Sequence, residues 1–396
     1  MLPALTLRDF VSPPNAPSSG KAARDLRLDF FRGLALFFIF VGHIPNNVVS
    51  WLTIRNFGLS DATEIFIFVS GYSAMLAYGA TLRRQGFTFA AAQVLRRCWQ
   101  IYVAHIFLTV VFIAYIAYVS MKYRNPMFVE EMRIVIFVAE PHVTLWQALL
   151  LKFKPGNLDV LPLYVALLLI FPLVLWGMNR NAPLVLTASF LLWLAANIFN
   201  WNLPGHPRGT TWFFNPFAWQ LLFVFGAFAA HARHLDLWER LNPRVFVPLA
   251  IMILALSLLL VVSWSNPKLH AWLIPQGLAK IMYPIDKTNL DILRILHFLA
   301  LAYLVVRFVK ASAGFLTWRV AWPAIICGQH SLHIFCLGAF LSFAGHFVLV
   351  EFNGSIAMQI AVSIAGIAIM VGLAALIGWF RQRDGAPKKA AVAKAA

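Results

Sequence analysis

Long apolar blocks, separated by short polar connections, make up most of this chain. Each block holds about 20 mostly apolar residues, and a helix of that length crosses the ~30 Å hydrocarbon core of a bilayer. The pattern predicts an all-α, polytopic integral membrane protein with about ten transmembrane helices. The predicted spans are residues 31–51, 62–82, 98–120, 159–178, 183–200, 215–232, 245–264, 291–309, 320–345 and 355–379.

One membrane domain, residues 29–380, accounts for nearly the whole chain. Residues 1–28 contain Ser-Pro-Pro and Ser-Ser-Gly and are predicted to form a disordered cytoplasmic tail. The basic, Ala-rich residues 381–396 are predicted to form a second cytoplasmic tail. No short apolar core with a small-residue cleavage site precedes the first long block, so a cleaved signal peptide is not expected.

Composition and charge support a membrane protein. Hydrophobic residues make up 61% of the 396 positions and charged residues 12%, whereas a soluble domain carries about 25% charged residues. In a soluble protein a net charge of +17 would suggest nucleic acid. If the N-terminus is inside, however, 21 of the 32 basic residues fall on cytoplasmic segments. This excess follows the positive-inside rule and predicts cytoplasmic termini and no nucleic-acid partner.

Three polar residues share one face of the first predicted helix. Arg32 and His43 are three turns plus about 20° apart, and Asp29 is about 40° short of four turns from His43. The rise of about 16 Å places Arg32 at the cytoplasmic mouth and His43 near the midplane. A charge facing lipid costs roughly 2.5–3.5 kcal/mol, so the stripe predicts a central polar channel. Alternatively, Arg32 anchors the helix at the headgroups and His43 bonds a neighbouring helix.

The second predicted helix begins with two acidic residues, Asp61 and Glu64, and continues to Ser70-Gly71. Glu64 is a candidate to orient or charge the imidazole of His43. The alternative is that Asp61 caps the helix and that Glu64 pairs with a basic residue. The Ser-Gly pair permits a close helix approach or a kink.

Further candidates lie at the ends of other spans. Arg96 and Arg97 open the third span, where they can hold phosphate or simply anchor the helix. Tyr164 is expected near the outer end of the fourth span and Trp219 opens the sixth. Both are candidates for substrate binding, although aromatic residues at membrane interfaces are common.

The start of the eighth span is basic. If this helix extends back to Lys287, then Lys287, Asp291 and Arg294 share a face, and His297 follows one turn later. Such a stripe can hold a carboxylate or a glycan. The alternative is an Asp291–Arg294 pair with interfacial anchoring.

The first two helices resemble the integral-membrane acyltransferase-three superfamily. Its signature is an Arg, ten residues and a His, followed on the next helix by an acidic residue, an apolar run and Ser-Gly-aromatic. Arg32, His43, Glu64 and Ser70-Gly71-Tyr72 match this pattern, although the family usually has Asp where this chain has Glu64. The chain is more closely similar to the OpgC-type branch, linked to succinylation of osmoregulated periplasmic glucans, in RLDFFRGLALFFIFVGHIP, FGLSDATEIFIFVSGY, LDVLPLY, FNPFAWQLLFVFGA, DKTNLDILRILHFLAL and GQHSLHIFCLG.

The resemblance implies a membrane-bound O-acyltransferase of the bacterial inner membrane. It would move an acyl group, with succinyl favoured, from cytoplasmic acyl-CoA to a hydroxyl of a periplasmic glucan. Acyl-CoA is then a co-substrate, and no tightly bound cofactor is expected. The three cysteines show no metal-ligand spacing, so no metal site is predicted.

Roles follow for the candidate residues. His43 is the expected general base, and Glu64 and Asp29 complete the catalytic set. Phosphates of the donor are expected at Arg32, Arg96 and Arg97, and substrate at Asp61, Tyr164, Trp219, Lys287, Arg294 and His297. The alternatives are an O-acetyltransferase of another envelope polysaccharide, a transporter or flippase for a polar glycan or lipid, and a sensor or assembly subunit without turnover.

Overall fold

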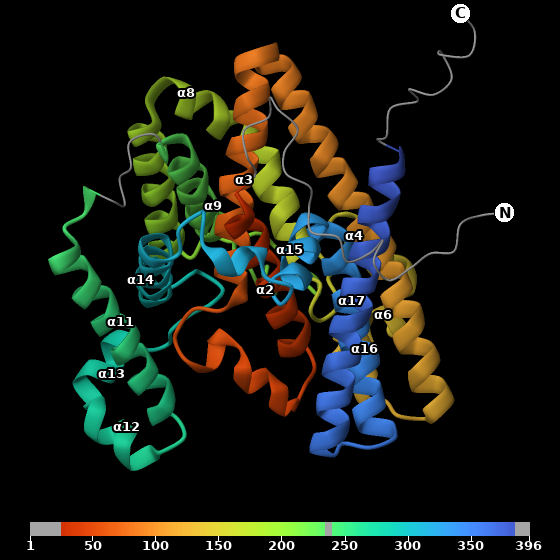
Figure 1. Ribbon diagram of the computed structural model, residues 1–396. Coiled ribbons are helices and arrows are strands. Elements are labelled where there is room, and N and C mark those ends of the chain that lie inside the picture. The colour runs from red at the N-terminus through yellow and green to blue at the C-terminus, as the bar shows by residue number, and fades with distance from the viewer. Residues whose placement is uncertain (1–24, 234–239, 385–396) are drawn as a thin grey trace, which may run out of the picture.

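The computed structural model describes residues 25–233 and 240–384, which form a bundle of helices (Figure 1). Within these residues no β-strand occurs, and an isolated bridge joins Pro204 to Thr211. The helices are α2 (Leu26–Gly42), η1 (Val48–Leu52), η2 (Ile54–Asn56), α3 (Ala62–Gln85), α4 (Phe87–Tyr123), α5 (Met127–Glu131), α6 (Val135–Ala139), α7 (Pro141–Leu149), α8 (Val160–Ile198), α9 (Pro216–His231), α11 (Pro243–Ser263), α12 (Pro267–Leu273), α13 (Gln276–Met282), α14 (Ile292–Phe308), η4 (Gly314–Thr317), α15 (Trp322–Gln329), α16 (Ser331–Glu351) and α17 (Ile356–Asp384).

Six of these helices are long and apolar enough to cross a bilayer, namely α3, α4, α8, α11, α16 and α17. The all-helical membrane fold predicted from the apolar blocks is therefore confirmed. The expected count of about ten spans and the cytoplasmic position of both termini stay predictions.

Helix α8 accounts for two predicted spans at once. Its 39 residues would extend about 58 Å if straight, roughly twice the hydrocarbon core. The helix is interrupted at Asn181, whose backbone is non-helical, and Pro183 follows. The Asn181 side chain accepts a hydrogen bond from the backbone N–H of Leu184 at 3.0 Å. The helix therefore restarts after a kink between the predicted spans 159–178 and 183–200.

The helix found at the first predicted span, 31–51, is α2, which is shorter than that span and begins five residues earlier. Helix α2 starts at Leu26, after Asp25 accepts a hydrogen bond from the N–H of Arg27, so residues 26–28 belong to it and not to the predicted tail. The helix stops at Gly42 because Pro45 cannot continue it. The predicted span 320–345 is likewise divided at His330 into α15 and α16. The remaining tail residues, 1–24 and 385–396, lie outside the described residues.

Two pairs of glycines let helices cross in direct backbone contact. A Cβ atom on Gly71 would stand 1.9 Å from the carbonyl oxygen of Phe223, and one on Gly226 of the facing helix 2.1 Å from that of Phe68. Gly33 of α2 and Gly328 of α15 make the same kind of crossing. Small residues permit such close approach in membranes. These crossings hold α2 and α3, which carry the predicted polar stripe, against α15 and α9.

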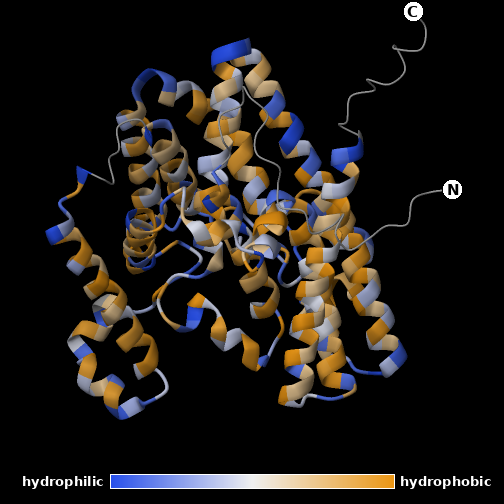
Figure 2. Cartoon of the chain, viewed as in Figure 1, coloured by the Kyte–Doolittle hydropathy of each residue, from blue (hydrophilic) through white to orange (hydrophobic). Residues whose placement is uncertain are grey.

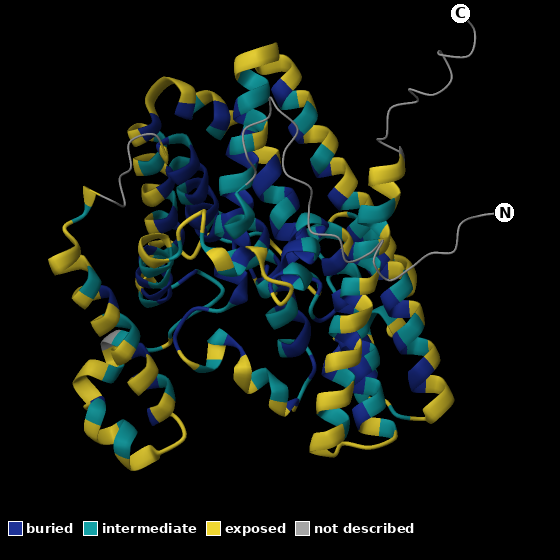
Figure 3. Cartoon of the chain, viewed as in Figure 1, coloured by how far each residue is buried: buried dark blue, intermediate teal, exposed yellow. Residues whose placement is uncertain are grey.

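The outer helices expose apolar side chains. Only 17% of the most apolar window of α11 and 22% of that of α17 is buried, against 56% for α8. Figures 2 and 3 show the same relation, because exposed positions on the peripheral helices are largely hydrophobic. An exposed apolar surface of this kind is typical of contact with lipid. The helices that carry the candidate residues lie inside this shell.

Candidate functional site

Arg32 and His43 lie at opposite ends of the inner part of the bundle. Helix α2 is continuous between them, so about 16 Å of helical rise separates the two positions. The Arg32 guanidinium donates to the carbonyl oxygen of Val69 at 3.2 Å and to Ser73 Oγ on α3. His43 follows the last residue of α2 and faces the start of α3. The two helices thus run antiparallel along the predicted stripe.

The first of two hollows is the arginine cavity, with a volume of about 160 Å³. It brings together three of the predicted site residues, Arg32, Arg97 and Tyr164, with hydroxyl groups from α3 and α16. The full lining is Arg32, Phe66, Ser70, Ser73, Ala74, Ala77, Tyr78, Arg97, Leu161, Tyr164, Ser331, Leu332 and Phe335. Two cations and several hydroxyl groups make this cavity suited to an anionic ligand.

Two expectations for this region need correction. Arg96 lies on the exposed face of α4, about 100° from Arg97, and does not line the cavity. Tyr164 lies in the cavity with Arg32 and not in an outer aromatic belt. Its position follows from the loop before α8, which enters the protein interior with Phe153 and Leu158 fully packed.

The second hollow is the histidine pocket, with a volume of about 60 Å³. Its lining is Phe38, Ile39, Gly42, His43, Thr53, Ile54, Arg55, Asp61, Ala62, Thr63 and Lys287. Among the described residues none bonds the buried Nδ1 of His43. The imidazole therefore shares the pocket with three charged groups, Arg55, Asp61 and Lys287, and its Nδ1 has no partner among the described residues.

Four charged side chains form a network in which two line this pocket and two lie behind them. Lys287 Nζ lies 2.5 Å from Asp61 Oδ2, and Arg294 reaches Glu64 at 2.6 Å and Asp61 at 3.4 Å. Burial alone would raise the pKa of Asp61, but Lys287 and Arg294 outweigh it and hold that pKa below its ordinary value. Asp61 and Glu64 also form a capping box at the start of α3. Two carboxylates therefore meet two cations.

The network confirms the alternative given for Asp61 and Glu64, a helix cap and a pairing with a basic residue, and differs from the helical face expected for Lys287. Glu64 is fully buried against Arg294, and no hydrogen bond joins it to His43. Helix α14 begins only at Ile292, because the side chain of Asp291 caps it by accepting from the N–H of Leu293. Lys287 therefore shares no helical face with Arg294. It comes from the preceding loop and meets Arg294 at Asp61.

Trp219 and His297 hold this loop and the start of α3 and do not line either hollow. Trp219 is fully buried and donates from Nε1 to the carbonyl oxygen of Lys287 at 3.0 Å. His297 Nδ1 lies 2.7 Å from Ser60 Oγ, and its ring packs so tightly on Gly58 that a Cβ there would overlap it. These residues place Lys287 and Asp61 beside the pocket and take no direct part in its lining.

Asp29 is buried at the crossing of α2 with α15 and lines neither hollow. A Cβ on Gly328 would stand 1.9 Å from its carbonyl oxygen. Fourteen residues of helix place it about 21 Å from His43, so the two side chains do not act on one atom. The expected catalytic pairing of Asp29 with His43 is not found.

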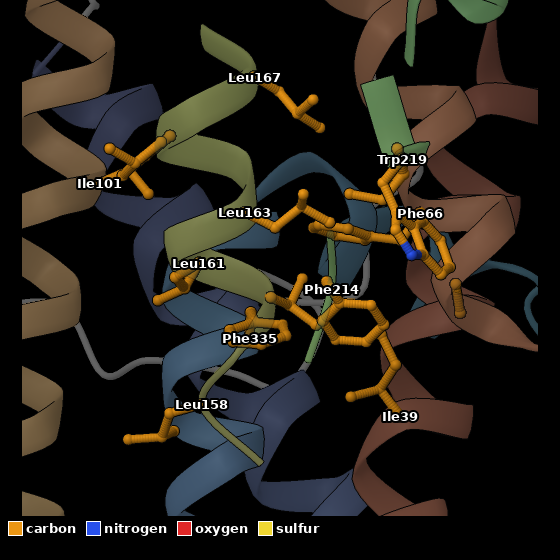
Figure 4. Packing of buried hydrophobic residues seen from close by; sticks show 14 of the residues in the cluster. Ile39, Phe66, Ile101, Leu158, Leu161, Leu163, Leu167, Phe214, Trp219 and Phe335 are labelled. Atoms are coloured by element: carbon orange, nitrogen blue, oxygen red, sulfur yellow. The ribbon is translucent and has the colours of Figure 1, made fainter. Parts of the chain in front are cut away.

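An apolar septum separates the arginine cavity from the histidine pocket. Figure 4 shows Ile39, Phe66 and Phe335 in one packed cluster. Ile39 lines the histidine pocket, whereas Phe66 and Phe335 line the arginine cavity, and their ring centroids lie 6.0 Å apart. The arginine cavity and the histidine pocket are therefore separate hollows in the described structure.

A family model described as OpgC protein matches residues 24–382. The chain belongs to the OpgC family. The match covers every helix that forms the two hollows and extends almost to the end of α17. No curated protein and no solved structure gives a significant match. Membership of the OpgC family indicates a membrane acyltransferase that modifies a glucan.

One pocket residue of this OpgC-family protein was not singled out from the sequence. Arg55 lines the histidine pocket from η2, and its Nη1 donates to the carbonyl oxygen of Gly42 at 3.3 Å. It is the lone basic residue between His43 and Asp61. Its position as a single basic residue was the available indication of a role in the site. The sequence alone, however, does not indicate which helix end an exposed arginine in such a segment approaches.

Proposed function

We propose that this protein is an acyl-CoA-dependent O-acyltransferase of the bacterial inner membrane, with succinyl as the favoured acyl group and a periplasmic glucan as the acceptor. One observation carries the proposal. Helices α2 and α3 contribute both to a cavity that holds Arg32 and, from α4, Arg97, and to a pocket with a partly unpartnered histidine. A donor and an acceptor can therefore approach one reaction centre from opposite sides.

The donor side is assigned to the arginine cavity. Arg32 and Arg97 are suited to the phosphates of acyl-CoA because a guanidinium binds two oxygens at once. The 16 Å from Arg32 to His43 fits an extended pantetheine arm that carries the thioester to the imidazole. The arm would have to displace Phe66 and Ile39, which close the path in the described structure.

The orientation of the helices supports a cytoplasmic donor. The α3–α4 turn, the kink of α8 and the C-terminal end of α17 lie toward the same end of the bundle (Figure 1). These segments carry a shared set of basic residues, namely Arg83, Arg84, Arg180, Arg381 and Arg383. By the positive-inside rule that end faces the cytoplasm. The arginine cavity lies toward it along α3, and the histidine pocket lies toward the outer end.

The chemistry is direct acyl transfer with His43 as general base. The glucan hydroxyl oxygen attacks the thioester carbonyl carbon while His43 takes the hydroxyl proton. The new carbon–oxygen ester bond forms and the carbon–sulfur bond breaks. The leaving CoA thiolate then takes the proton from the imidazolium. Lys287 lies in the same pocket and can stabilise the negative charge that develops on the carbonyl oxygen.

The proposal is tested with His43→Ala and His43→Gln in purified protein supplied with acyl-CoA and a glucan oligosaccharide. We expect glucan acylation to fall about a hundredfold or more while binding of acyl-CoA is retained, because general-base catalysis is worth 10²–10⁴-fold. His142→Ala, an exposed histidine on α7, is the matched control and should keep full activity. Normal turnover by a folded His43→Ala protein would overturn the assignment.

A further inference from the structure

Arg55 stands at the rim of the histidine pocket without an ionic partner. Its side chain is exposed, and in the described part of the chain no carboxylate lies within ion-pair distance of it. Its contact with Gly42 is a long one, at 3.3 Å, to a neutral carbonyl oxygen. A charge-assisted bond to an anion is shorter and roughly twice as strong. The guanidinium can therefore exchange this carbonyl for a carboxylate.

The other charges around the pocket cancel. Lys287 is paired with Asp61, and behind them Arg294 is paired with Glu64. Arg55 therefore leaves the pocket with one uncompensated positive charge. The rest of the lining beside His43 is mostly apolar, from Phe38, Ile39, Ile54 and Ala62. This combination suits a ligand with a short apolar segment that ends in a negative charge.

The order of residues along the path defines which part of the donor would reach Arg55. Arg32 lies in the N-terminal half of α2, and His43 follows the C-terminal end of this helix. Arg55 contacts Gly42, the residue immediately before His43, from the outer loop. If the donor enters past Arg32 and its thioester carbon stops at His43, the atoms beyond that carbon extend toward Arg55.

We propose that Arg55 binds the free carboxylate of a dicarboxylic acyl group and so selects a half-thioester of a short dicarboxylic acid over an acetyl donor. This inference rests on the proposed function and adds the residue that sets its acyl specificity. The planar guanidinium matches a carboxylate through two parallel hydrogen bonds. The small volume of the pocket, about 60 Å³, favours an acyl group with a short chain.

The experiment compares succinyl-CoA with acetyl-CoA in full-length protein reconstituted in vesicles, with a glucan oligosaccharide as acceptor. Arg55→Gln keeps a donor for the Gly42 carbonyl and removes the charge. We expect its kcat/KM for succinyl-CoA to fall roughly ten- to a hundredfold, as for loss of a hydrogen bond to a charged group, with acetyl-CoA little changed. The kcat/KM of Arg55→Lys for succinyl-CoA should lie between those of the wild type and Arg55→Gln.

Arg208→Gln is the matched control, because Arg208 is also an exposed arginine in a loop but does not line the pocket. It should leave the ratio of the two donors unchanged. Equal loss with both donors in Arg55→Gln would mean that Arg55 only supports the end of α2, and no loss with either would mean that it does not meet the donor. Both results overturn the inference. If the wild-type protein transferred neither acyl group, the proposed function itself would be wrong.

Discussion

The half-buried carboxylate of Asp61 and the buried one of Glu64 are stable because two cations reach them from a distant part of the chain. Lys287 and Asp61 are 226 residues apart in sequence and in direct contact in the fold. The sequence predicts that these residues matter, since charges are costly within a membrane protein. It does not predict that Glu64 bonds Arg294 and not His43, because that choice depends on where α14 packs.

Removing one charge from this network should destabilise the protein more than removing a matched pair of opposite charges. Glu64→Gln leaves Arg294 with only the distant contact to Asp61, and breaking a buried pair costs about 3–5 kcal/mol. In Glu64→Gln/Arg294→Gln the Asp61–Lys287 pair remains balanced. We expect the double variant to melt above the Glu64→Gln variant in detergent. If the loss of stability in the double variant equalled the sum of the losses in Glu64→Gln and Arg294→Gln, the two residues would not be coupled.

Lys154 gives the protein a specific pH dependence. This lysine lies in the loop before α8, with Nζ 3.9 Å from the centre of the Trp212 ring. Burial lowers the pKa of Lys154 to about 8, partly opposed by Asp159. The folded state therefore disfavours the charged amine, and this penalty is present in full below pH 8. It is relieved as pH rises from about 8 toward the ordinary lysine pKa.

The measurement is the difference in melting temperature between wild type and Lys154→Met across pH 7 to 10. We expect the wild type to gain stability relative to the variant over this range. Arg133→Met, a change at another basic residue of the connection between α4 and α8, should show no such trend because arginine stays charged throughout. A constant difference between wild type and Lys154→Met would contradict the lowered pKa.

The helices were predictable where length and apolarity decided them, whereas the end of α2 was not. The spans of α3, α11 and α17 follow from their apolar blocks. The stop of α2 at Gly42 depends on Pro45, and the restart of α8 depends on Asn181. The predicted span 31–51 continued past Pro45, whereas the polar residues 179–181 correctly separated the predicted spans 159–178 and 183–200. The Ser70-Gly71 step was correctly predicted as a point of close approach, although its partner helix, α9, was not.

The crossing of α3 and α9 should be intolerant of any side chain at Gly71. Gly71→Ala would place a methyl group 1.9 Å from the backbone oxygen of Phe223, so the helices must separate. We expect a loss of about 1–3 kcal/mol in stability, as for overpacked cores, and a lower melting temperature. Gly372→Ala on α17 has open space around the new methyl group and should be neutral. Equal tolerance at both sites would refute the close crossing.

The whole molecule places two hollows on either side of an apolar septum. A transporter needs a path that opens to both sides in turn, whereas an acyltransferase needs only a thin barrier that the donor arm can cross. In the proposed function, the septum would also keep water from the donor thioester. That separation could not be predicted from the sequence, because Ile39, Phe66 and Phe335 come from three different helices.

A thinner septum should therefore allow hydrolysis of the donor thioester to compete with acyl transfer to the glucan. Phe66→Leu removes an aromatic ring that is only 3% exposed without leaving a large cavity. We expect CoA release to rise relative to glucan acylation, because water can then reach the thioester. The two products are measured together, by thiol titration and by mass spectrometry of the glucan. Phe107→Leu, on the exposed surface of α4, should keep the ratio of the two products.

The long separation between Asp61 and Lys287 also has a consequence for biogenesis. At about 5–20 residues per second, a ribosome needs roughly 11–45 seconds to synthesise the 226 residues between them. During that interval the nascent chain carries two carboxylates on α3 with neither cation yet made. A truncated chain that ends before Lys287 should therefore insert α3 poorly and be degraded faster than one that extends through α14, as a pulse-chase experiment can measure. Completion of the charged network at the histidine pocket thus waits for the last third of translation.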